Sequence, residues 1–261
     1  MKTKLLLGAI DAAFSAGDAI MQIYSTTFTV ELKDDQSPLT AADKAAHSII
    51  QSSLAKYDFP ILSEEGKSVS YDERNLWRQY WCVDPLDGTK EFIKRNGEFT
   101  VNIAFIENNS PTLGVIYQPV TGDLFAGYNG QVYFFKRKNQ LTLNENNLSA
   151  FRIDSSEPSN DKIVVVASRS HLSPETVEYI KQLKETSREI EMINAGSALK
   201  FCLLVAGKAT IYPRFAPTME WDTAAGHAIL KACGKNIFSY PSGLEMVYNK
   251  QSLVNEWFVA R

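Results

Sequence analysis

The chain has 261 residues, of which 44% are hydrophobic and 22% charged, the composition of an ordinary soluble globular protein. Its formal net charge of −3 excludes a strongly basic surface, so we expect neither a nucleic acid polymer nor anionic lipid as a partner. Any polyanionic ligand must therefore be neutralised locally, by bound metal and a few Lys or Arg side chains.

Apolar residues recur at helical spacing along the N-terminal segment and predict an amphipathic helix that ends at about Tyr24. Asp11 interrupts its apolar run short of the roughly 7–15 residues of a signal-peptide core. No stretch has the roughly 18 apolar residues of a membrane span. The three cysteines, Cys82, Cys202 and Cys233, lie far apart among apolar neighbours, as reduced, buried thiols do. We expect an unprocessed cytoplasmic protein without a transmembrane segment.

The first half predicts one further long helix and a series of strands. Thr40 is a candidate N-cap for a helix that runs to about Lys56. Short apolar strands at 59–62 and 80–83 lead into the acidic residues Glu64 and Asp84. Turns rich in Asn and Gly separate four further β runs and predict an antiparallel meander: 100–106, 112–118, 124–128 and 132–136.

The second half alternates strands with helices, the order of an α/β fold. We expect strands at 163–167, 190–193 and 209–212, and helices at 174–184, 197–206 and 222–232. A polar stretch at 155–161 marks a soft boundary. The sequence therefore predicts an N-terminal α+β sub-domain, 1–155, and a C-terminal α/β sub-domain, 156–261, in one compact unit.

Two carboxylates three residues apart follow the strand at 80–83, in the run Asp84-Pro85-Leu86-Asp87-Gly88-Thr89. This pattern alone is weak, because Asp-Gly often marks a turn. Here, however, Gly88 would let the backbone approach a ligand, and a helix predicted at 89–94 would direct free N–H groups at an anion. Downstream, Trp221-Asp222-Thr223-Ala224-Ala225-Gly226 supplies a third carboxylate at the start of a helix.

If Glu64, Asp84, Asp87 and Asp222 converge, their charges must be compensated. At about 5 Å and an effective dielectric constant near 20, each close pair repels by roughly 3 kcal/mol. Two divalent cations would neutralise four carboxylates and leave a positive field for a phosphate. Because the set contains no His or Cys, oxygen ligands favour Mg²⁺ over Zn²⁺. The sequence thus predicts a metal-dependent phosphatase.

Both motifs, in this order and separation, resemble those of the lithium-sensitive, Mg²⁺-dependent phosphomonoesterase superfamily of inositol monophosphatase and fructose 1,6-bisphosphatase. Within it, the chain looks most like the 3'(2'),5'-bisphosphate nucleotidases. That finer resemblance rests on residues 37–43, 63–65, 89–92, 96–103, 168–171 and 212–214. The resemblance implies a layered αβαβα sugar-phosphatase fold, of mixed α/β class.

The resemblance also implies a ligand set for two Mg²⁺ ions and leaves a third open. Glu64, Asp84 and the Leu86 carbonyl would bind one ion, and Asp84, Asp87 and Asp222 the other. Asp43 and Thr89, together with Glu64, would be catalytic, since the Asp43–Thr89 pair would help a water attack the phosphorus. Asp43 could instead stabilise the first turn of its helix, and Glu65 could be solvated or support Glu64.

The implied substrate contacts come from both halves of the chain: Glu64, Leu86, Asp87, Gly88, Thr89, Ser168, His171, Gly196, Ser197, Lys200, Arg214 and Asp222. His171 would lie near the base, and Lys200 and Arg214 near a second phosphate. Simpler interpretations are helix capping for His171 and a turn with an exposed lysine for 196–200. We expect His47 and His227 to be structural.

The resemblance implies hydrolysis of the 3'-phosphate of adenosine 3',5'-bisphosphate, and of its sulfated form, in sulfate assimilation. An inositol monophosphatase is the alternative enzyme. A non-catalytic binder of metal and nucleotide is the alternative of another class, which the intact Asp43–Thr89 pair disfavours. The resemblance leaves open a monomer or a homodimer, and peripheral attachment to the cytoplasmic face of the inner membrane.

Overall fold

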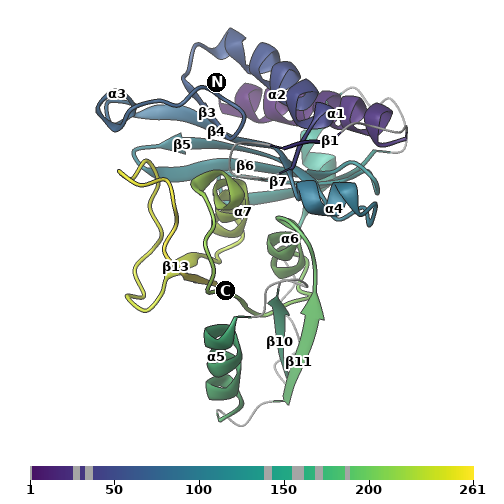
Figure 1. The fold of residues 1–261 in the computed structure, drawn as a ribbon. Helices are drawn as coiled ribbons and strands as arrows, with labels where there is room; N and C mark the ends of the chain where they lie inside the picture. Colours follow the sequence, from purple (N-terminus) through teal and green to yellow (C-terminus); the bar gives the residue numbers. More distant parts are fainter. Residues whose placement is uncertain are drawn as a thin grey trace.

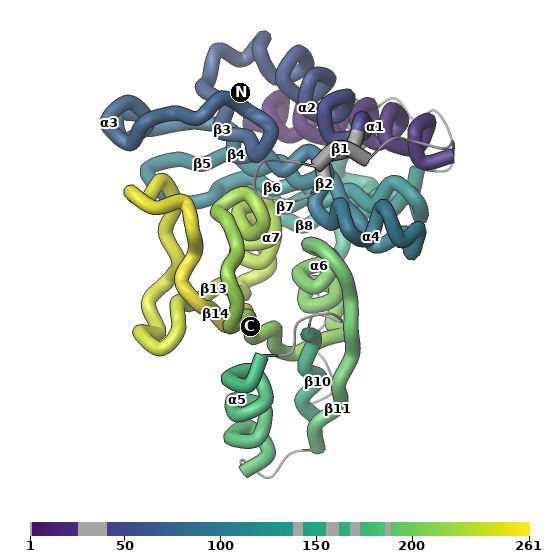
Figure 2. Tube along the Cα trace, in the orientation of Figure 1, coloured from purple at the N-terminus to yellow at the C-terminus, as the bar shows by residue number. Residues whose placement is uncertain are grey.

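The computed structural model describes residues 2–25, 30–32, 38–137, 143–154, 162–167, 173–185 and 189–261, and omits the side chains of 30–32 and 38–40. Its elements stack as helices, sheet, helices, small sheets and helix (Figures 1 and 2). This is the αβαβα arrangement that the resemblance implies.

The first layer consists of α1 (Lys2–Tyr24) and α2 (Ala41–Leu54), which pack on each other and on one face of the large sheet. Small and aliphatic residues of α1, such as Ala9, Ala13 and Ala16, are fully buried there. The helix is long and apolar enough to be a candidate membrane span, with mean hydropathy 1.3, but half of that window is buried in the fold. A core helix passes the same test, so the candidate is weak.

The large sheet has seven strands in the order β3-β4-β5-β6-β7-β8-β9. Their bounds are Ile61–Ser63, Gln79–Asp87, Thr100–Glu107, Ser110–Gln118, Asp123–Tyr128, Gln131–Lys136 and Arg152–Ile153. Only β3 and β4 pair in parallel; the rest form the predicted antiparallel meander. Asn129 and Gly130 have positive φ angles of 51° and 70°, as a tight two-residue hairpin requires.

The other face of this sheet is covered by α7 (Glu220–Ala232), which lies across β4 to β8 and beside α6 (Leu199–Val205). Glycines permit this close approach. A Cβ atom at Gly114 of β6 would lie 2.2 Å from the Ala225 carbonyl oxygen, and one at Gly226 would lie 2.2 Å from the Phe201 ring. A helix from the second half thus shares a core with the sheet of the first half.

Small sheets follow below. Strands β10 (Lys162–Ala167) and β11 (Glu189–Asn194) pair in parallel, and β14 (Phe258–Ala260) lies between β12 (Tyr212–Arg214) and β13 (Ile237–Ser239). Helix α5 (Pro174–Lys184) forms the last layer (Figure 1). The remaining elements are β1 (Val30–Leu32), β2 (Pro38–Thr40), η1 (Ala55–Tyr57), α3 (Tyr71–Arg74), α4 (Thr89–Ile93) and η2 (Leu148–Phe151).

The predicted strands at 209–212 and 80–83 differ most from the structure. The strand expected at 209–212 is wrong, because β12 starts at Tyr212 and Ile211 makes only an isolated bridge to Val165. The strand expected at 80–83 continues through both acidic residues to Asp87. Cys82 and Cys202 are buried thiols, and Cys233 is a partly buried one. The sub-domain boundary at residue 155 stays a prediction.

Candidate active site

The two acidic residues of β4 point to the same side of the sheet because the strand carries a bulge. Asp84 pairs with Asn102 and Asp87 with Thr100, so three steps along β4 match two along β5. In a regular strand, residues three apart face opposite sides. The extra residue restores the alternation, and both carboxylates face the side covered by α7 while Leu86 packs in the core under α1.

Four other carboxylates lie close enough to Asp84 to affect its ionisation. Burial raises its pKa well above the usual value, and the charges of Glu64, Asp87, Asp222 and Asp43 raise it further, in that order. The Leu86 N–H donates to Asp84 Oδ1 at 3.1 Å. Burial, with Asp87 as the next cause, also raises the pKa of Asp222, to about 8. The fold therefore gathers the acidic residues that the sequence singled out.

Neutral side chains hold Asp87 in place. Ser197 Oγ donates to Asp87 Oδ2 at 2.6 Å and lies 3.1 Å from the Asp87 carbonyl oxygen. Asn102 Nδ2 donates to the same carboxylate at 3.4 Å, and Thr100 Oγ1 donates to Asn102 Oδ1 at 2.9 Å. Sequence reasoning gave Thr100 and Asn102 no role. Their signal was two polar residues on one face of an otherwise apolar strand.

The predicted pair Asp43 and Thr89 meets at this site. Asp43 lies buried in the first turn of α2, and Thr89 begins α4 directly after Gly88, whose φ of 95° suits glycine. Thr89 Oγ1 donates to Asp43 Oδ2 at 3.4 Å. Such contacts are often long in free enzymes and shorten when substrate binds. Glu64 follows β3, with its side chain exposed and its N–H bonded to the Val83 carbonyl.

A cavity of about 150 Å³ opens beside these carboxylates. Its lining combines residues of both halves: Asp87, Gly88, Lys90, Glu91, Ser197, Lys200, Phe201, Tyr212, Arg214, Thr218, Asp222 and Thr223. Besides the predicted metal ligands and catalytic residues, five predicted substrate contacts lie in the cavity or next to it. They are Gly88, Gly196, Ser197, Lys200 and Arg214. Ser168 and His171 lie outside the described residues.

Three cationic residues line the cavity, Lys90, Lys200 and Arg214, and the last two were predicted to contact the substrate. Lys200 is 5% exposed and donates to the Ala195 and Ser197 carbonyl oxygens at 3.3 and 2.5 Å. Burial lowers its pKa to about 8, against the attraction of Asp87. Arg214 Nε is buried without a hydrogen-bond partner, which leaves a donor available to a ligand. These two groups give an otherwise acidic site an anion-binding wall.

The backbone N–H of Gly196, one of the predicted substrate contacts, donates to Glu98 Oε2 at 2.8 Å. A Cβ atom at Gly196 would lie 2.9 Å from both the Glu98 Cβ and its carbonyl oxygen, so only glycine fits without displacement. Glu98 thereby fixes the turn that carries Ser197.

Comparison with known proteins identifies the family of this chain. The model of the inositol monophosphatase family matches residues 1–257. The chain belongs to the inositol monophosphatase family. Enzymes of this family are metal-dependent phosphatases, generally with Mg²⁺.

The individual relatives are similar over nearly their whole length. The chain is 43% identical over 251 residues to the 3'(2'),5'-bisphosphate nucleotidase CysQ of Escherichia coli (strain K12), covering 94% of this chain and 95% of that protein. The crystal structure of CysQ from Bacteroides thetaiotaomicron matches with a TM-score of 0.90 and 45% identity, covering 98% and 96% of the two chains. A Thermotoga maritima inositol monophosphatase, with TM-score 0.69 and 22% identity, shares the fold.

The residues of this chain fit the family's metal. Within the described part of the chain, no three His, Cys, Asp or Glu side chains already surround one point as a closed metal site. The donor set is nevertheless entirely oxygen, as Mg²⁺ prefers. Burial and then mutual repulsion raise the pKa of Asp84 and of Asp222, as expected of carboxylates whose charge a divalent cation would balance.

Proposed function

We propose that this protein is an Mg²⁺-dependent 3'(2'),5'-bisphosphate nucleotidase that releases the 3'-phosphate of adenosine 3',5'-bisphosphate to give AMP. The observation that carries the proposal is the cavity that joins Asp87 and Asp222 to Lys200 and Arg214. A substrate with two phosphates needs cation ligands for one and cationic side chains for the other. The 43% identity to a curated bisphosphate nucleotidase supports the same assignment.

Five groups would hold the metal. Glu64, Asp84 and the Leu86 carbonyl would bind one Mg²⁺, and Asp84, Asp87 and Asp222 a second. When bound, the ions would neutralise charge and lower the pKa of a water, which makes it easier to deprotonate for attack on phosphorus. Ser197 and Asn102 orient Asp87, and the Met219 N–H orients Asp222 through a 2.8 Å hydrogen bond to Oδ2.

Proton handling would fall to Asp43 and Thr89. Because the Thr89 hydroxyl donates to Asp43 Oδ2, its oxygen can accept a hydrogen bond from an attacking water. As the water loses its proton to Thr89 Oγ1, the Thr89 hydroxyl proton would pass to the Asp43 carboxylate.

The second phosphate would be bound by Lys200 and Arg214. With a pKa of about 8, Lys200 is mostly protonated at neutral pH, and a bound phosphate would favour the charged form further. Ser168 and His171 stay predictions for the base. Activity on the sulfated nucleotide, inhibition by lithium, a role in sulfate assimilation and a cytoplasmic location belong to the same proposal.

Phosphate release tests the substrate class. We expect turnover of adenosine 3',5'-bisphosphate with Mg²⁺ and none with EDTA, and slower release from inositol 1-phosphate. Equal or faster release from inositol 1-phosphate would reject the nucleotide assignment in favour of an inositol monophosphatase, the second candidate, whose fold is shared.

Two substitutions test the roles. Asp84→Asn should abolish turnover at saturating Mg²⁺ while circular dichroism stays native, and retained activity would exclude the ligand assignment. Lys200→Met should lower kcat/KM for adenosine 3',5'-bisphosphate by ~10- to 100-fold, the value of one charged hydrogen bond. It should change kcat/KM for 3'-AMP, which lacks the second phosphate, far less. Lys136→Met, in an exposed ion pair with Asp123 at 2.8 Å, is the matched control.

A further inference from the structure

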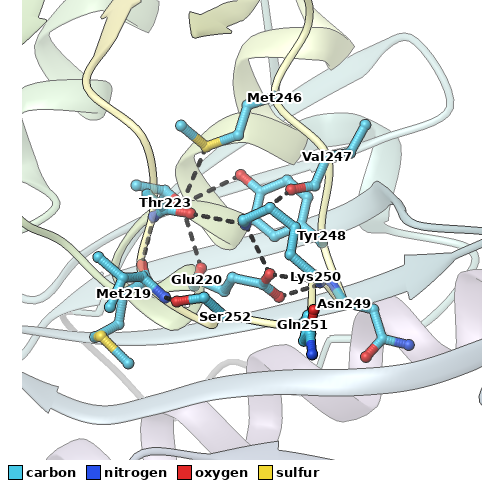
Figure 3. A network of polar contacts seen from close by, with 12 residues as sticks. Met219, Glu220, Thr223, Met246, Val247, Tyr248, Asn249, Lys250, Gln251 and Ser252 are labelled. Carbon is cyan, nitrogen blue, oxygen red and sulfur yellow. Dashed lines mark hydrogen bonds and ion pairs between the residues drawn. The ribbon is translucent and has the colours of Figure 1, made fainter. Parts of the chain in front are cut away.

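Glu220 is a buried acidic residue for which the reaction has no use. It begins α7 two residues before Asp222, has 0% exposure, and does not line the cavity of the active site. Figure 3 shows it at the centre of a network of polar contacts with residues near the C-terminus. A buried carboxylate must be compensated by its neighbours, so its partners indicate what it does.

All described partners of the Glu220 carboxylate come from one segment, residues 247–255, called the brace below. Oε2 accepts from the Asn249 N–H at 2.7 Å, and Oε1 accepts from the Lys250 N–H at 3.0 Å and from Lys250 Nζ at 2.7 Å. Lys250 Nζ also donates to Asn255 Oδ1 at 3.2 Å. One carboxylate therefore fixes both the backbone and a side chain of the brace (Figure 3).

The other end of the brace holds the residues just before Asp222. Asn255 Nδ2 donates to the Met219 carbonyl at 2.7 Å, and the Asn255 N–H donates to the Thr218 carbonyl at 2.8 Å. The N–H of the same Met219 donates to Asp222 Oδ2 at 2.8 Å. The Met219 residue that aims the Asp222 carboxylate is thus itself held by Asn255.

The brace also contacts the segment between Glu64 and Asp84. Arg74 of α3 is 3% exposed, and its Nη1 donates to Asn249 Oδ1 at 2.9 Å. Asn249 Nδ2 returns a 2.6 Å hydrogen bond to the Arg74 carbonyl. The brace is therefore hydrogen-bonded at Asn249 to Arg74 of α3 and, through Asn249 and Asn255, to the residues that begin α7.

We propose that the brace positions Asp222 for its metal ion, with Glu220 and Asn255 as positioning residues. The metal part rests on the proposed function, since it takes Asp222 as a ligand; the mechanical part rests only on the contacts above. Groups that orient a metal ligand through hydrogen bonds typically change metal affinity by ~10- to 100-fold when removed.

Two variants test this from opposite ends of the brace. Glu220→Gln keeps the shape but replaces one accepting oxygen with an NH₂ group, which cannot accept the brace N–H groups. Asn255→Leu keeps the volume and removes the donor to Met219. Lys136→Met, on β8, is the control.

Calorimetric titration with Mg²⁺ alone, and amide hydrogen exchange of residues 218–224 in EDTA, are the readouts. We expect Mg²⁺ to bind both variants ~10- to 100-fold more weakly, while kcat recovers at saturating Mg²⁺. Exchange should accelerate in 218–224 more than in the large sheet. The control should match the wild type in both.

Unchanged Mg²⁺ affinity in a folded variant, with only a lower Tm, would overturn the proposal and leave Glu220 a stabilising residue. If Glu220→Gln fails to fold, Asn255→Leu alone decides. If the wild type itself binds no Mg²⁺, the proposed function fails instead. Hydrogen exchange then still decides on the brace, because unchanged exchange in 218–224 would refute it.

Discussion

Replacing Lys200 with Met should make the protein more stable at neutral pH while it impairs binding of the second phosphate. Lys200 lies buried in α6, where its ammonium donates to two backbone carbonyls. Burial is the main cause that lowers its pKa from 10.5 to about 8. A lysine kept charged in such a place opposes folding, and sites that bind anions accept this penalty for function.

The magnitude and sign follow from linkage. One pH unit corresponds to about 1.4 kcal/mol, so the lowered pKa corresponds to about 3 kcal/mol. Below pH 8, Lys200 is charged in both states and the penalty is full. Between pH 8 and 10.5 the unfolded chain binds more protons, so wild-type stability rises with pH and the penalty disappears. Met removes the penalty but also two hydrogen bonds of ~1 kcal/mol each.

We therefore expect the variant to be ~1 kcal/mol more stable than wild type at pH 7 and ~2 kcal/mol less stable above pH 10.5. Urea unfolding from pH 7 to 10.5, in EDTA, measures the difference in unfolding free energy between variant and wild type. The titration of all other groups is common to both proteins and cancels in this difference. Lys136→Met should show no such trend, since Lys136 is exposed. A stability difference that stays constant across this range would refute the reasoning.

Gly114→Ala should lower the free energy of unfolding by about 1–3 kcal/mol or more, because its Cβ would lie 2.2 Å from the Ala225 carbonyl oxygen. Calorimetry should show a lower Tm, and an unchanged Tm would contradict this close contact between α7 and the sheet. Burial lowers the pKa of His227 to about 4, so stability should fall by up to about 3 kcal/mol as the pH drops from 6.5 to 4. Urea unfolding should show that His227→Gln loses this part of the acid sensitivity; an unaltered pH dependence would argue against it. Asn102→Leu should weaken Mg²⁺ binding by ~10-fold in a calorimetric titration through the loss of its bond to Asp87, and wild-type affinity would exclude that role.

Elements whose signals lie within their own residues could be predicted from the sequence. The helix Pro174–Lys184 was predicted with its observed bounds, and Ser173 caps it by accepting from the Thr176 N–H. Asn129 and Gly130 form the predicted hairpin turn. The convergence of the acidic residues could be inferred because their types and order leave few other uses for so many carboxylates.

Other features depend on partners far away in the chain, which local patterns do not contain. Strand β12 starts three residues later than predicted because its register is set by β14, a C-terminal strand that sequence reasoning did not assign. Sequence reasoning gave Glu220 no role, since its partners Asn249 and Lys250 lie about thirty residues away. The N–H of Gly196 bonds Glu98, which spacing alone could not indicate.

The bulge in β4 has a consequence for how this protein tolerates changes in length. Deleting one residue between Asp84 and Asp87 would leave them two positions apart, a spacing at which a regular strand without a bulge also keeps both carboxylates on one side. Deleting both intervening residues would make them neighbours, and a regular strand would then turn one of them toward the aliphatic layer beneath α1. The shorter deletion should therefore be compatible with metal binding, whereas the longer one should abolish it even in a protein that still folds.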